Sequence, residues 1–216
     1  MPYKDDPIAR SFSLHEIIAN SATHALGVGL SIAGLVVLII RAVNARDPWY
    51  LVGGIIYGIS LLLLYLASSI YHGTPRSGCN PLLQRLDHAA IFILIAGTYT
   101  PFLLTKLRGT LGWITFGLVW SLAVGALVAK LILTQSFVKP PVWLYVVMGW
   151  FAVPAFNGSV RSIGTASLIF LLIGGLFYTS GIIFYRWRQL PFSHAIWHLF
   201  VIGGSVFHFF SVVHLV

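Results

Sequence analysis

The sequence predicts an all-α membrane protein, a bundle of seven transmembrane helices, from its composition, its apolar segments and the placement of its polar residues. Of the 216 residues, 58% are hydrophobic and only 8% are charged. A soluble domain of this length needs more charge to cover its surface, so the excess apolar residues require lipid as a second solvent. We therefore expect a single membrane domain over residues 1–216, with no cleaved signal peptide.

Seven apolar segments alternate with short polar loops. Most hold about 20 residues, which at about 1.5 Å per residue cross a hydrocarbon core of about 30 Å. The fifth is the weakest, because it is short and contains Pro154. Glycines inside the segments favour close helix packing, and Pro101 indicates a helix kink. The predicted spans cover residues 17–40, 50–71, 86–105, 111–133, 142–157, 165–185 and 193–216.

The thirteen Lys and Arg residues indicate the orientation. Cytoplasmic loops carry an excess of these residues, so eight against five favours a cytoplasmic N-terminus and, after seven spans, an outside C-terminus. They are scattered and form no basic stripe, which argues against nucleic-acid binding. The N-terminal side holds Lys4, Arg10, Arg76, Arg85, Lys130, Lys139, Arg186 and Arg188, and the opposite side holds Arg41, Arg46, Lys106, Arg108 and Arg161.

Polar residues inside the spans gather on one membrane face. Placing an ionisable group in lipid is energetically unfavourable, so each such residue in a span is expected to have a structural or functional role. Because consecutive spans cross the membrane in opposite directions, the starts of the first, third and seventh spans and the end of the second lie at the same face. These places hold Ser68 and His72, Asp87 and His88, His194 and His198, and Glu16, Asn20 and His24.

The spacing of these residues favours a metal site. His194 and His198 in SHAIWH are four residues apart, so both project from one helix face, as a metal-binding pair requires. Three histidines with an open position are typical of catalytic zinc. Asp87 would then orient a histidine or exchange a proton with water. In the alternative interpretation, the histidines bind lipid headgroups and Asp87 is an ordinary charge near a helix N-terminus.

Other polar residues are given structural interpretations. Glu16, Asn20 and His24 follow one another at four-residue intervals and are interpreted as an interhelical hydrogen-bond ladder. The single Cys79 excludes an internal disulfide and is interpreted as an ordinary thiol. Four further histidines are interpreted as structural or interfacial: His15, His88, His208 and His214.

Four motifs, EIIANSATH, ASSIYH, LQRLDHAAIFILIAGTYTP and SHAIWHLF, resemble those of the hemolysin III family, the compact bacterial branch of the progestin and adipoQ receptor family. Adiponectin receptors and alkaline ceramidases are more distantly similar. The resemblance implies seven helices and a zinc ion near the cytoplasmic face. It assigns zinc to His72, His194 and His198, the acid beside the activated water to Asp87, the preceding serine to Ser68, and the span-1 motif to Glu16, Asn20, Thr23 and His24.

The function that this resemblance implies is zinc-dependent hydrolysis of a lipid amide or ester, ceramidase-like, in a bacterial cytoplasmic membrane. Such an enzyme would contribute to membrane fluidity homeostasis, with membrane lipids as substrates. The sequence does not indicate protein partners, and it leaves open whether the chain forms a homo-oligomer. One alternative is a receptor or sensor with structural zinc, in which Asp87 is the fourth ligand. A second is a cytolysin or pore, although the middle and far portions of the spans are mostly apolar.

Overall fold

The computed structural model describes residues 13–74, 81–132, 142–151, 160–187 and 189–216, and within them all regular secondary structure is helical. Six of the helices are long and apolar enough to cross a membrane, which agrees with a multi-pass membrane protein. The helices are α1 (Leu14–Ala45), α2 (Pro48–Gly73), α3 (Pro81–Leu104), α4 (Thr110–Ile132), α5 (Val142–Trp150), α6 (Val160–Ile163), α7 (Thr165–Arg186) and α8 (Ser193–Val213).

Capping residues define the first two helices and the tight turn between them. Ser13 and Glu16 form a capping box at the start of α1, and Arg46 ends this helix in a left-handed conformation with φ 53°. The Asp47 side chain then accepts from the backbone N–H of Trp49 at 2.9 Å and starts α2. Because so few residues separate the helices, α1 and α2 pack side by side in opposite directions.

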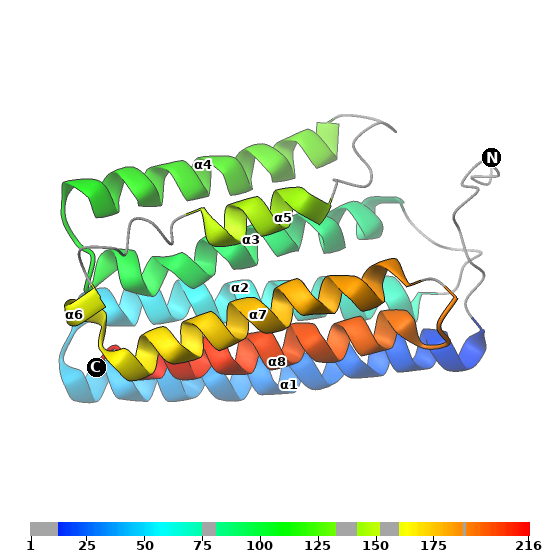
Figure 1. The fold of residues 1–216 in the computed structure, drawn as a ribbon, viewed down its shortest axis with the longest axis horizontal. Coiled ribbons are helices and arrows are strands. Elements are labelled where there is room, and N and C mark those ends of the chain that lie inside the picture. The colour runs from blue at the N-terminus through cyan, green and yellow to red at the C-terminus, as the bar shows by residue number, and fades with distance from the viewer. Residues whose placement is uncertain (1–12, 75–80, 133–141, 152–159, 188) are drawn as a thin grey trace.

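The long helices form one bundle in which α8 lies between α1 and α7 (Figure 1). Along the chain, α1 packs on α2, α2 on α3 and α3 on α4. The α3 helix has the largest buried share of the candidate spans. The starts of α1, α3 and α8 and the end of α2 lie at one end of the bundle, as span parity predicts (Figure 1).

The α1 and α2 helices extend beyond the predicted spans at both ends, whereas α8 ends at Val213, three residues before the predicted end. The α3 helix begins at Pro81, five residues before the predicted start, and Pro101 lies within its last turn. A Cβ on Gly53 would lie 2.8 Å from the Pro101 backbone, so the glycine permits the close approach of α2 to α3. The fifth predicted span is represented only by α5, which has nine residues; Pro154 lies outside the described residues.

Candidate metal centre

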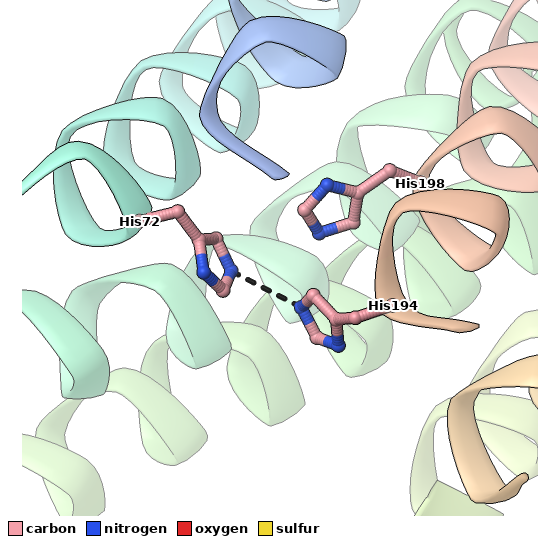
Figure 2. Close-up of side chains that lie close together, drawn as sticks. All are labelled: His72, His194 and His198. Carbon is pink, nitrogen blue, oxygen red and sulfur yellow. Dashed lines mark hydrogen bonds between the residues drawn. The ribbon is translucent and has the colours of Figure 1, made fainter. Parts of the chain in front are cut away.

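Three histidines from two distant helices converge at one end of the bundle. His72 lies in the last turn of α2, and His194 and His198 lie one turn apart at the start of α8 (Figure 2). One ring nitrogen of each lies within 4.8 Å of the other two. The structure therefore brings together the predicted ligand set, although metal binding itself stays a prediction.

The His198 side chain is fully buried and has one unpaired ring nitrogen. Its Nδ1 lies 3.1 Å from the backbone oxygen of Asn20 and 3.0 Å from the hydroxyl of Thr23. Its Nε2 is buried and has no hydrogen-bond partner among the residues that the structure describes. Because an unpaired buried polar atom is costly, this nitrogen needs a partner that a metal ion would provide.

The spacing of the three imidazoles fits a zinc ion. With zinc–nitrogen bonds of about 2.0–2.1 Å, tetrahedral ligand nitrogens lie about 3.3 Å apart. The Nε2 atoms of His72 and His194 are 3.1 Å apart, close to this value. The widest separation within the cluster is at most 4.8 Å, so it needs to contract by no more than about 1.5 Å. Imidazole nitrogens suit zinc, and three of them leave a fourth position open.

Asp87 and Ser68 lie beside the histidine cluster rather than within its ligand group. The side chains of Asp87 and Ser68 are hydrogen-bonded to each other and both are buried. Ser68 precedes His72 by one helical turn on α2. The Asp87 carboxylate is not a member of the group of possible ligand atoms. The acid is thus hydrogen-bonded to α2 and lies outside the group of three histidines.

Lys130, which the sequence pattern indicates only as a charge that sets the membrane topology, is a candidate functional residue. It lies in the last turn of α4, is 2% exposed and interacts electrostatically with Asp87. A buried cation in a membrane span is costly, which makes it a functional candidate. The signal in the sequence was its position inside the apolar segment 111–133.

The α1 residues Glu16, Asn20 and His24 are all buried. Among the described residues, Glu16 is the one of the three whose side chain forms an interhelical hydrogen bond of the kind predicted. The Glu16 carboxylate accepts from the backbone N–H of Phe192 at 3.0 Å, which joins α1 to the start of α8. The Asn20 amide and both His24 ring nitrogens have no partner among the described residues. The ladder interpretation is wrong for these two side chains, because α1 is rotated so that His24 stacks on His198, with ring centroids 3.5 Å apart.

The other histidines are not among the possible ligands, although His88 interacts electrostatically with His72 and His194. His15 and His214 are exposed, and the buried His208 has its Nε2 3.1 Å from the backbone oxygen of Leu171 on α7. The backbone oxygen of His88 accepts from the Tyr145 hydroxyl at 3.1 Å, which ties α5 to α3. Cys79 lies outside the described residues.

Comparison with known proteins gives similarity over nearly the whole chain. A family model described as Haemolysin-III related matches residues 12–209. The chain is 46% identical over 202 residues to the Hemolysin-3 homolog of Bacillus subtilis (strain 168), covering 94% of this chain and 95% of that protein. It is 43% identical over 201 residues to Hemolysin-3 of Bacillus cereus, covering 93% and 92%.

A more distant relative is the monocyte to macrophage differentiation factor of Homo sapiens, 27% identical over 207 residues that cover 92% of this chain and 83% of that protein. No solved structure matches the chain.

Proposed function

Because the chain belongs to the hemolysin III family, we propose that this multi-pass membrane protein is a zinc-dependent hydrolase of an amide or ester bond in a membrane lipid. The observation that carries the proposal is the convergence of His72, His194 and His198 with a buried, unpaired Nε2 on His198. Three imidazoles with an open position are the donor set of catalytic zinc sites. The proposed reaction is ceramidase-like hydrolysis of a lipid amide or a related ester.

The residues around the cluster have separate roles in this proposal. When bound, zinc supplies a Lewis acid that polarises the scissile carbonyl and makes water nucleophilic near neutral pH. The Asp87 carboxylate accepts a proton from the attacking water and returns it to the leaving nitrogen or oxygen. The Ser68 hydroxyl donates to Asp87 and so orients the acid, and Lys130 supplies a positive charge beside it.

A groove between α3, α4 and α5 supports lateral access of a lipid. Its cavity volume is about 250 Å³, and its walls are apolar apart from Lys130. Because Lys130 interacts with Asp87, one end of the groove approaches the acid. An acyl chain in this groove would carry its polar end toward the reacting groups. The lining residues are Phe92, Leu122, Ala126, Lys130, Leu144, Val147, Met148 and Phe151.

Seven membrane crossings are part of the same proposal, with the metal centre on the cytoplasmic side. The end of α4 and the start of α7 lie at opposite ends of the bundle, which supports a further crossing between these two helices (Figure 1). The start of α1 and the end of α8 also lie at opposite ends, which supports an odd number of crossings. The excess of Lys and Arg on the side of the N-terminus favours a cytoplasmic metal centre.

Zinc content and lipid turnover, measured on the same purified protein, test the proposal. We expect about one zinc per chain, with loss of zinc in His198→Ala and in His72→Ala. The wild-type protein should hydrolyse at least one lipid in a panel of amides and esters, and a chelator should abolish this activity. Wild-type protein without zinc, or zinc-loaded protein without turnover across the panel, would contradict the proposal.

Asp87→Asn separates catalytic from structural zinc. If zinc is catalytic, the variant keeps its zinc and loses turnover by at least about 100-fold, since proton transfer contributes about 10²–10⁴-fold. If zinc is structural and Asp87 is its fourth ligand, the variant loses zinc together with stability. Lys106→Met, which changes an exposed charge, is the control for handling and reconstitution.

A further inference from the structure

We propose that Thr23 is a positioning residue that holds His198 in the tautomer whose Nε2 presents its lone pair to the metal. This inference rests on the proposed zinc site and gives a role to the span-1 motif, which the proposed reaction does not otherwise use. The motif residues Glu16, Asn20, Thr23 and His24 lie on α1, whereas the ligand lies on α8.

The hydrogen bonds of Thr23 determine which way its proton points. Its hydroxyl oxygen lies 2.8 Å from the backbone oxygen of Ala19 and 3.0 Å from that of Asn20. Backbone oxygens only accept, so the single hydroxyl proton is donated within α1. The hydroxyl oxygen is then an acceptor toward His198 Nδ1, which lies 3.0 Å away.

The backbone of Asn20 imposes the same condition on His198. Its carbonyl oxygen lies 3.1 Å from Nδ1 and can only accept. The Asn20 carbonyl requires that Nδ1 carries the proton, and the Thr23 hydroxyl accepts from the same N–H while its own proton is donated to the Ala19 carbonyl. A neutral imidazole has one N–H, so its Nε2 must carry the lone pair. This is the tautomer that a ligand binding through Nε2 needs.

Two further contacts hold the ring of His198 in place. The His24 ring lies almost parallel to it, with an angle of 22° between the planes, and is itself packed edge-on against Tyr65. The Glu16 carboxylate binds the Phe192 N–H, which sets the position of α1 along the start of α8. The ring of His198 is thus restrained on one face and at Nδ1, which leaves Nε2 directed toward His72 and His194 (Figure 2).

The affinity of the metal-free full-length protein for zinc tests the role of Thr23. In detergent micelles, with zinc alone as the probe and a chromophoric chelator as competitor, Thr23→Val should weaken zinc binding by about 10-fold or more. Thr23→Ser keeps the hydroxyl and should restore the wild-type affinity. Thr98→Val is the matched control, because the buried Thr98 hydroxyl donates to the backbone of its own helix.

The outcomes separate this inference from the proposed function. Wild-type protein that binds no zinc overturns the proposed function itself. Wild-type protein that binds zinc while Thr23→Val binds it equally tightly overturns only the positioning role. NMR of ¹⁵N-histidine-labelled metal-free protein provides a readout without zinc: a His198 proton on Nδ1 supports the assignment, and a proton on Nε2 overturns it.

Discussion

At the scale of single residues, burial of polar atoms distinguishes this bundle end from an ordinary helix interface. Asn20, His24 and His198 are each at most 2% exposed, yet each carries side-chain atoms without a hydrogen-bond partner among the described residues. Leaving such a buried atom unpaired lowers the free energy of unfolding by about 1–3 kcal/mol. Their concentration around one cluster is consistent with a site whose partner is a metal ion and the molecules bound with it.

Lys130 should affect catalysis without affecting metal binding. Lys130→Met removes the positive charge beside Asp87, and we expect turnover to fall by about 10-fold, a change of about 1.4 kcal/mol in the barrier. Zinc content should stay at the wild-type value, because a lysine ammonium group has no lone pair to offer a metal ion. Lys130→Arg, which keeps the charge, should retain more activity than Lys130→Met. Equal turnover in wild type and Lys130→Met, measured on zinc-matched protein, would remove this residue from the proposal.

At the scale of helices, a buried serine joins three elements in the middle of the bundle. The Ser205 hydroxyl on α8 lies 2.6 Å from the hydroxyl of Tyr65 on α2 and 2.7 Å from that of Tyr178 on α7. The sequence predicts mostly apolar residues at this depth. Two tyrosine hydroxyls on separate helices are instead hydrogen-bonded to the same serine, because polar groups in the membrane interior must be paired within the protein.

Ser205→Ala should loosen the association of these helices. It removes two interhelical hydrogen bonds of about 0.6 kcal/mol each, so we expect a loss of about 1 kcal/mol. For a chain of this length, that loss lowers the melting temperature by about 2–4 °C. Ser180→Ala is the control, because the Ser180 hydroxyl donates to backbone oxygens of its own helix, α7. Identical melting curves for the two variants in detergent would mean that the Ser205 contacts do not stabilise the bundle.

At the scale of the whole molecule, the number of crossings decides on which sides of the membrane the two ends of the described chain lie. The α5 helix has nine residues, about 14 Å at 1.5 Å per residue, and spans only about half of a hydrocarbon core. Six helices satisfy the length criterion by themselves. Among the described residues, α5 alone is therefore too short to form the proposed seventh crossing.

Cysteine accessibility distinguishes six crossings from seven. In a Cys79→Ser background, His15→Cys and Val216→Cys should react with a membrane-impermeant maleimide from opposite sides of the membrane. With a cytoplasmic N-terminus, residue 15 should be labelled in inside-out membrane vesicles, and residue 216 should be labelled in spheroplasts. Labelling of both residues from the same side would mean an even number of crossings.

The sequence by itself determined the membrane class, six of the helices and the histidines of the candidate site. Hydropathy and helix length are properties of contiguous residues, and the spacing of His194 and His198 fixes their common face. Alternating span direction then brings His72 to the same end of the bundle. These predictions need no knowledge of side-chain contacts, which is why they agree with the helices and the arrangement that the structure describes.

Only the tertiary structure decided how the individual atoms of the site are oriented. The contacts of His198 with Asn20 and Thr23 join residues 178 and 175 positions apart, and they depend on how α1 and α8 rotate about their axes. The same holds for Lys130 beside Asp87 and for His24 stacked on His198. Rotation and side-chain conformation are set by packing between distant helices, which no local pattern of hydrophobicity encodes.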